Sequence, residues 1–112
     1  MRILALTTCH NRRAQTLQAL GSLLGQSNPP QYRLDVCVVD DGSTDGTSEA
    51  VRAAYPTVVV LSGSGNLFWA GGMRFAWDTY ASRQQFDYLL VLNDDIRLYD
   101  GALRGLLNAA HT

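Results

Sequence analysis

Two clusters of acidic side chains stand directly after apolar runs of this sequence. Asp40 and Asp41 end one run, and Asn93, Asp94 and Asp95 end another. Carboxylates that share a cleft repel each other, which costs free energy. A divalent cation, or a ligand that donates N–H and hydroxyl groups to the carboxylates, offsets this repulsion. Mg²⁺ and Mn²⁺ prefer oxygen ligands, and one or two carboxylates commonly hold them while substrate phosphates complete the shell. The second cluster supplies such a set of oxygens.

Apolar runs alternate with longer segments of helical period, four times over. The expected strands cover residues 3–6, 34–39, 58–61 and 88–92, and the expected helices cover residues 14–24, 48–55, 70–81 and 102–109. Strand runs that are almost continuously apolar are typical of parallel strands with helices on both faces. Because right-handed crossovers join such strands, the order predicts an α/β fold with a doubly wound, mostly parallel open sheet.

Local signals place the ends of these elements. The first expected helix carries an apolar stripe made of Leu17, Leu20, Leu23 and Leu24. Turn-forming residues separate the elements at 28–30, 41–43, 62–65 and 100–101. We expect Asp45 to cap the second helix and Asp100 to cap the last one, because their carboxylates can accept from unpaired first-turn N–H groups.

Open parallel sheets bind ligands outside the carboxyl ends of their strands. The sequence is unusually polar at those ends. The candidate site residues are Thr8, Asn11, Arg12, Asp41, Asn66, Asn93, Asp94 and Asp95. A capped turn would explain the first acidic pair by itself, and a solvated loop would explain the second. Neither explains why acidic pairs recur at one edge of the sheet.

Arginine and aromatic side chains supply further candidates. Arg12, Arg74 and Arg97 are candidate phosphate ligands, because a guanidinium presents a fork of donors that matches phosphate oxygens. A solvated surface position is the simpler explanation of each arginine taken alone. Phe68 and Trp69 are candidates to line a sugar or base pocket, with packing onto the sheet as the alternative.

Composition excludes several classes of function. Nine basic and ten acidic residues give a net charge of −1, which argues against a nucleic-acid partner or a polybasic membrane contact. All nine basic residues are arginine, so the chain has no P-loop lysine and no receiver-domain lysine. Cys9 and Cys37 lack the spacing of a metal site, so we expect buried, reduced thiols. Without a signal segment or an apolar run of transmembrane length, the cytoplasm is the expected location.

Four motifs in register resemble those of family 2 inverting glycosyltransferases, whose fold is called GT-A. They are residues 8–12, residues 39–47, Asn66 with Gly71 and Gly72, and residues 92–95. Their order and spacing match over the whole chain, and the run 65–73 is most similar to rhamnosyl- and galactofuranosyl-transferase-like members. The resemblance implies transfer of a sugar, with inversion, from a UDP- or dTDP-sugar to a hydroxyl of a saccharide or lipid-linked acceptor, as in cell-wall or polysaccharide synthesis.

The same resemblance implies roles for individual residues. Thr8 and Asp41 would contact a pyrimidine base, with the Asp41 carboxylate accepting from the ring N3–H of uracil or thymine. Asp94 would approach the ribose. Asp95 would bind the Mg²⁺ or Mn²⁺ that bridges the diphosphate, and Asn93 stands where many members have the first aspartate of the metal motif. The nucleotide-sugar-binding set is completed by Asn11, Arg12 and Asn66.

The general base of this family follows a later strand, and no carboxylate of this chain fits that role. Asp78 and Asp87 are expected on the wrong side of the sheet, and Asp100 is expected to be a cap. We therefore expect the general base to lie beyond Thr112, the last residue of the sequence.

Residues 1–112 are accordingly expected to form one domain, the donor-binding half of a longer enzyme that works in the cytoplasm or at the inner face of the membrane. Its uncovered apolar surface favours self-association. A nucleotidyltransferase and a non-catalytic nucleotide-binding or assembly module are the alternatives.

Overall fold

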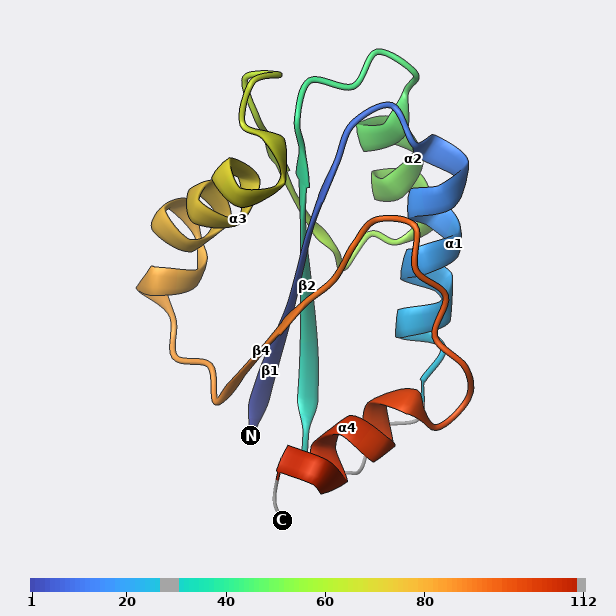
Figure 1. Cartoon of the computed structure of the whole chain (residues 1–112), viewed down its shortest axis with the longest axis vertical. Helices are drawn as coiled ribbons and strands as arrows, with labels where there is room; N and C mark the ends of the chain where they lie inside the picture. The colour runs from blue at the N-terminus through green and yellow to red at the C-terminus, as the bar shows by residue number, and fades with distance from the viewer. Residues whose placement is uncertain (27–30, 111–112) are drawn as a thin grey trace.

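The structure, a computed structural model, describes residues 1–26 and 31–110 and shows parallel strands alternating with helices (Figure 1). The sheet order is β3-β2-β1-β4, and every pairing is parallel. The predicted doubly wound α/β fold is confirmed. In chain order the elements are β1 (Arg2–Cys9), α1 (Arg13–Leu24), β2 (Arg33–Asp40), α2 (Thr47–Ala54), β3 (Val59–Ser62), α3 (Phe68–Thr79), the 3-10 turn η1 (Ala81–Arg83), β4 (Tyr88–Val91) and α4 (Ala102–Ala110).

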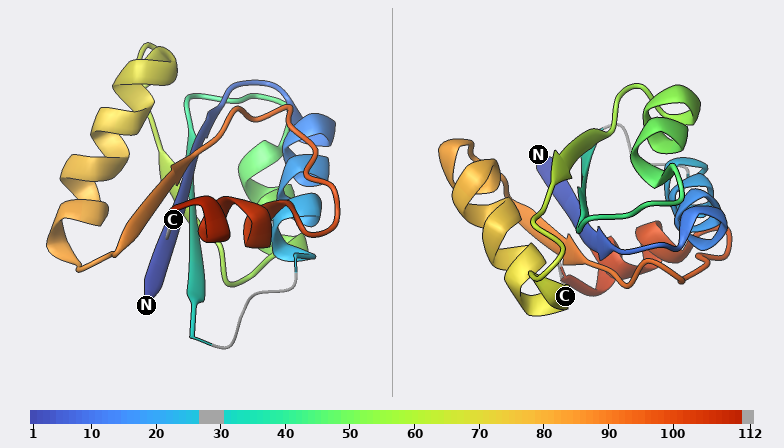
Figure 2. Two further views of the ribbon diagram at one scale, coloured as in Figure 1. Left: turned by 60° about the horizontal axis from the view of Figure 1, so that its bottom comes forward. Right: turned by 90° about the horizontal axis from the view of Figure 1, so that it is seen from above.

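Helices cover both faces of the sheet (Figure 2). Side chains alternate between the two faces along each strand. Leu4 and Leu6 of β1 therefore pack on one face with Ala76 of α3. Ala5 of the same strand packs on the other face with Leu20 of α1, next to α2 and α4. No described helix is long and apolar enough to cross a membrane.

The local signals of the sequence are confirmed in part. All four leucines of the α1 stripe pack into the core on that side of the sheet. Asp45 Oδ1 accepts from the N–H of Thr47, the first residue of α2, at 3.2 Å, but the N-cap residue is Gly46 and the helix has no side-chain cap. The expected cap on α4 is wrong, because the N–H of Leu103 donates to Gln26 Oε1 at 3.1 Å instead of to Asp100.

Strand β1 is longer than its apolar run. The sequence predicts an end at Leu6, but the ladder with β2 continues through Thr7, Thr8 and Cys9. Both threonines are buried although they are polar, because the pairing with the central strand β2 keeps them inside the sheet. The extension brings Thr8 to the edge where the candidate site lies.

Two expectations from the sequence fall on residues that the structure does not describe. The predicted break at 28–30 lies outside the described residues, and so does Thr112, beyond which the general base is expected. Both stay predictions.

Both cysteines are buried free thiols, as predicted. Burial raises the pKa of Cys9 and of Cys37 from 9.0 to about 12, and the charge of Asp40 adds to the rise at Cys9. A rise of this size leaves about a thousandth of the usual thiolate. We expect iodoacetamide at pH 8 to label the folded chain about a thousandfold more slowly than the chain in guanidinium, as measured by mass spectrometry. Equal rates would contradict the burial of both thiols.

Candidate functional site

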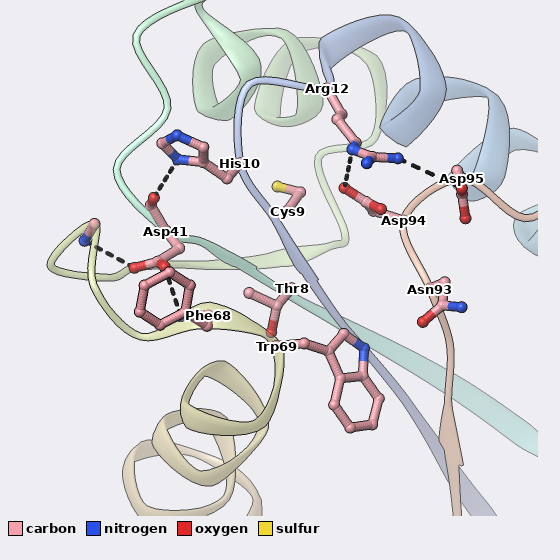
Figure 3. Close-up of a pocket in the computed structure, with 11 residues that line it drawn as sticks. Thr8, Cys9, His10, Arg12, Asp41, Phe68, Trp69, Asn93, Asp94 and Asp95 are labelled. Carbon is pink, nitrogen blue, oxygen red and sulfur yellow. Dashed lines mark hydrogen bonds and ion pairs between the residues drawn. The ribbon is translucent and has the colours of Figure 1, made fainter.

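A pocket of about 510 Å³ lies at the carboxyl ends of β1, β2 and β4, beside the start of α3 (Figure 3). It opens at the edge of the sheet where the sequence places the candidate residues. Thr8 and Arg12 come from the end of β1 and the loop after it, and Asp41 follows β2. Its lining consists of Thr8, Cys9, His10, Arg12, Asp41, Gly65, Phe68, Trp69, Asn93, Asp94 and Asp95.

Asp41 anchors the loop between β3 and α3. Its Oδ1 accepts from the N–H of Gly65 at 2.8 Å, and its Oδ2 accepts from the N–H groups of Leu67 and Phe68, each at 3.0 Å. The residue is buried. An ionised carboxylate has about four acceptor sites, so the three contacts leave about one for a ligand. The base contact predicted for Asp41 therefore has to share this carboxylate with the loop.

Asp40, the other member of that pair, belongs to a turn. Its Oδ1 accepts from the N–H of Ser43 at 3.1 Å, and its Oδ2 accepts from the hydroxyl of Ser48. It does not line the pocket. The capped-turn interpretation is right for Asp40, whereas Asp41 lines the pocket.

Arg12 lines the pocket together with the second acidic pair, Asp94 and Asp95. Its Nη1 donates to Asp95 Oδ2 at 3.4 Å, and its Nε lies 3.8 Å from Asp94 Oδ2 (Figure 3). The side chains of Arg12 and Asp95 are about half exposed, at 50% and 52%, while that of Asp94 is 14% exposed. A positive group is thus present among the carboxylates, as the charge argument requires, and in this structure it is a guanidinium.

The burial of Asp94 has an electrostatic consequence. Burial raises the pKa of Asp94 above its ordinary value, the guanidinium of Arg12 opposes that rise, and the neighbouring charge of Asp95 adds to it. A carboxylate in this position is stabilised by any further cation that enters the pocket. The electrostatics of the pocket therefore favour a positively charged ligand or cofactor.

Asn11 and Asn66, two of the predicted nucleotide-sugar ligands, do not line the pocket. Asn11 has a φ of 50° and braces two loops, because its Oδ1 accepts from the N–H of Thr44 at 2.7 Å and its own N–H donates to Ser43 Oγ at 2.8 Å. Asn66 is exposed, and its N–H donates to Ser64 Oγ at 3.2 Å. Their predicted ligand roles stay predictions, and Asn11 has a structural role that the sequence did not indicate.

The two other candidate phosphate ligands also lie outside the lining of the pocket. Arg97 donates to Gln18 Oε1 on α1 at 3.2 Å, and Arg74 is exposed on α3. Arg12 is the candidate arginine that the fold brings to the acidic pair. Its position next to the carboxyl end of β1 is the sequence signal that separates it from the other two.

The aromatic side chains of the pocket are more accessible than packing onto the sheet would allow. Phe68 is 74% exposed and Trp69 is 48% exposed, and both line the pocket. Phe68 also has a φ of 56°, which is unusual for a bulky residue, and its N–H is held by Asp41. His10, which sequence analysis left without a role, lines the pocket too, with its Nδ1 2.7 Å from the carbonyl oxygen of Asp41.

Gly72 permits the close approach of α3 to the pocket. A Cβ at this position would lie 2.1 Å from Thr8 Oγ1, 2.6 Å from its Cγ2 and 2.8 Å from its Cβ. Rotation of the threonine cannot relieve the last of these contacts. We expect Gly72→Ala to lower the free energy of unfolding by about 1–3 kcal/mol through overpacking, as measured by urea denaturation.

Gly71 is the matched control for that variant. A Cβ there meets Leu67 Cβ at 3.5 Å, an ordinary van der Waals contact. Gly71→Ala adds the same methyl group to the same helix, and alanine favours a helix over glycine by up to about 1 kcal/mol. The control variant should therefore be as stable as the original chain or more so. Equal losses in the two variants would contradict the role assigned to Gly72.

A divalent metal fits the oxygen groups at this edge only together with a ligand. No group of three or more His, Cys, Asp or Glu residues within the described ranges is placed to hold an ion by itself. Asp94 and Asp95 supply two carboxylates, and Asn93 adds an amide oxygen in the same lining. Mg²⁺ and Mn²⁺ are commonly bound by one or two carboxylates plus substrate phosphates, so the residues present fit a metal that arrives with a phosphorylated ligand.

Several solved structures have the same fold, and one of them is a mannosyltransferase. TarS from S. aureus (residues 1–349) matches with a TM-score of 0.74 and 22% identity over 96% of this chain and 32% of that chain. The mannosyltransferase PcManGT from Pyrobaculum calidifontis, in complex with GDP-Man and Mn²⁺, gives 0.76 and 22% over 96% and 31%. TarS in complex with UDP-GlcNAc gives 0.70 and 19% over 96% and 30%. These likenesses show the fold, and the chain spans about a third of the length of these proteins.

The sequence itself identifies the family. No curated protein gives a significant match. The model of the family described as Glycosyl transferase family 2 matches residues 5–112, nearly the whole chain. That match includes each strand end that contributes to the pocket. The chain therefore belongs to glycosyl transferase family 2.

Proposed function

We propose that this chain is the donor-binding half of a metal-assisted glycosyltransferase, which transfers a sugar with inversion from a UDP- or dTDP-sugar to an acceptor hydroxyl. The observation that carries the proposal is the pocket that joins Thr8, Asp41, Asp94 and Asp95 from separate strand ends. Family membership supports the reaction type. The solved relatives that bind GDP-Man with Mn²⁺ or UDP-GlcNAc support a nucleotide-sugar donor.

The polar groups of the pocket can divide the donor among them. Thr8 Oγ1 is buried and has no hydrogen-bond partner among the described residues, so it is available to a base edge. Asp41 keeps about one acceptor site, which suits a single ring N–H. In this proposal Asp94 accepts from the ribose, and Asp95 with Asn93 holds the metal. The bound metal would stabilise the negative charge that grows on the leaving diphosphate.

The carboxylates of the described pocket are all assigned by this proposal, so none is left as general base. Asp87 lies at the opposite end of the sheet, where its Oδ2 accepts from the N–H of Arg2 at 2.7 Å, the first residue of β1. This end of the sheet is opposite to the pocket, so Asp87 is not proposed as the base. We propose that the group that removes the acceptor proton comes from a part of the protein beyond Thr112. This proposal rests on one observation: no carboxylate that lines the described pocket is left without a role.

The proposal extends to the type of sugar that is transferred and to the class of acceptor. The run 65–73, which contains Phe68 and Trp69, favours a rhamnosyl- or galactofuranosyl-type donor. Both aromatic side chains line the pocket and leave much of their surface exposed, as a sugar or base platform requires. We propose a saccharide or lipid-linked acceptor, reached from the cytoplasm or from the inner face of a membrane.

Calorimetric titration of the chain with UDP, dTDP and GDP, each with and without Mn²⁺, tests the proposal. Binding of one pyrimidine nucleotide that requires Mn²⁺ is the expected result, and the preferred nucleotide names the donor class. Failure of all three nucleotides to bind would remove the donor-site proposal and favour an assembly module. Robust glycosyl transfer by these 112 residues would contradict the proposal that the general base lies beyond Thr112.

A further inference from the structure

Within the described part of the chain, the pocket has more negatively than positively charged side chains. Its lining includes the carboxylates of Asp41, Asp94 and Asp95 but only one guanidinium, that of Arg12. Backbone N–H groups hold the charge of Asp41, so Arg12 faces the other two carboxylates (Figure 3). A phosphorylated ligand would add further negative charge to this pocket.

Arg12 has a fixed backbone and a loosely held guanidinium. Its carbonyl oxygen accepts from the N–H of Thr16 at 2.8 Å at the start of α1, and the N–H of the next residue, Arg13, donates to Asp45 Oδ2 at 3.1 Å. The guanidinium reaches Asp95 at 3.4 Å and Asp94 at 3.8 Å and is half exposed. The ion pair with Asp95 joins two half-exposed side chains at 3.4 Å and is therefore weak, and the contact with the less exposed Asp94 is longer still at 3.8 Å. The charged end of Arg12 can therefore exchange partners without disturbing the fold.

We propose that Arg12 is a positioning residue that occupies Asp94 and Asp95 in the nucleotide-free chain and moves its guanidinium to the diphosphate when the donor binds. This inference rests on the proposed function. Its consequence is a coupling between two ligands. Arg12 competes with a divalent cation for the carboxylate of Asp95, so the cation binds weakly alone and strongly with a nucleotide.

The direction of the coupling follows from the partners that Arg12 has in each state. Without nucleotide, a cation that approaches Asp95 must displace a guanidinium and overcome its positive charge. With nucleotide, the phosphate oxygens offer the guanidinium a bidentate partner. Asp95 then becomes free for the cation, and Asp94 becomes free for the ribose. Each ligand thereby raises the affinity of the other by the same factor, as linkage requires.

The experiment is a calorimetric titration of the 112-residue chain with Mn²⁺ alone, and with UDP at saturating Mn²⁺. The variants are Arg12→Gln, Arg12→Lys and the control Arg97→Gln, which removes a guanidinium that contacts Gln18 outside the pocket. We expect Arg12→Gln to bind Mn²⁺ alone about five- to tenfold more tightly and UDP about tenfold more weakly. Arg12→Lys keeps the charge, so its affinity for Mn²⁺ should stay within about threefold of that of the original chain. Arg97→Gln should bind Mn²⁺ and UDP with the same affinities as the original chain.

Circular dichroism first confirms that each variant is folded. If Arg12→Gln binds Mn²⁺ no more tightly than the original chain, or if neither binds Mn²⁺ alone, Arg12 does not compete with the cation and the inference is overturned. The Mn²⁺ titration contains no nucleotide, so it decides the matter even if UDP fails to bind. Failure of the nucleotide arm in the original chain would instead count against the proposed function.

Discussion

Asp41→Asn is expected to lower the free energy of unfolding by about 2–4 kcal/mol, the largest stability effect that we predict for the pocket. The Asp41 carboxylate is buried and accepts from the N–H groups of Gly65, Leu67 and Phe68. An amide of the same shape keeps one acceptor oxygen and turns an NH₂ group towards N–H donors. At least one backbone N–H then loses its partner in a buried place, which costs more than the hydrogen bond was worth.

The same substitution should open the pocket on one side. Oδ2 of Asp41 fixes the N–H of Phe68, whose φ of 56° is strained for an aromatic residue. Without that hydrogen bond the strained conformation at the start of α3 loses the contact that stabilises it. Chemical denaturation measures the stability loss, and Asp95→Asn is the control, because it makes the same chemical change on a half-exposed side chain. The control should lie within about 0.5 kcal/mol of the original chain. A similarly small effect at Asp41 would show that its three contacts are not needed.

The fold follows from local patterns that the sequence contains in full. Each strand is a short apolar run and each helix is a longer amphipathic segment, so their alternation predicts the α/β class. The end of β1 does not follow in this way. Thr7 and Thr8 are polar in sequence and buried in structure, because they continue the pairing of β1 with β2. Burial at a strand end depends on neighbours that are distant in sequence.

The sequence predicts where the candidate site lies but not the contacts between its side chains. The rule that ligands bind at the carboxyl ends of parallel strands brings Thr8, Asp41 and Asp94 to one edge without further information. The contact between Arg12 and Asp95 spans 83 residues and exists because β1 and β4 are neighbours in the sheet. The sequence predicts the strands but not this order. For the same reason it could not show that Asp41 holds a loop more than 20 residues away.

Asp95→Ala should reduce the affinity for nucleotide in the presence of Mn²⁺ by about a hundredfold or more, the largest binding effect that we predict. Changes to groups that only support a metal ligand typically cost ten- to a hundredfold, and the proposed role of Asp95 is direct ligation. Its side chain is half exposed and its one described ion pair is the long contact to Arg12. The variant should therefore fold with little loss of stability.

Calorimetry of Asp95→Ala with UDP, with and without Mn²⁺, separates the loss of the metal from the loss of the pocket. Residual binding should no longer respond to Mn²⁺, because Asp94 and Asn93 alone offer a single carboxylate and an amide. The matched control is Asp78→Ala, which removes an exposed carboxylate of α3 outside the pocket and should leave both titrations unchanged. If Asp95→Ala still binds UDP in a Mn²⁺-dependent way, the direct metal ligand is Asp94, and Asp95 instead contacts the ribose.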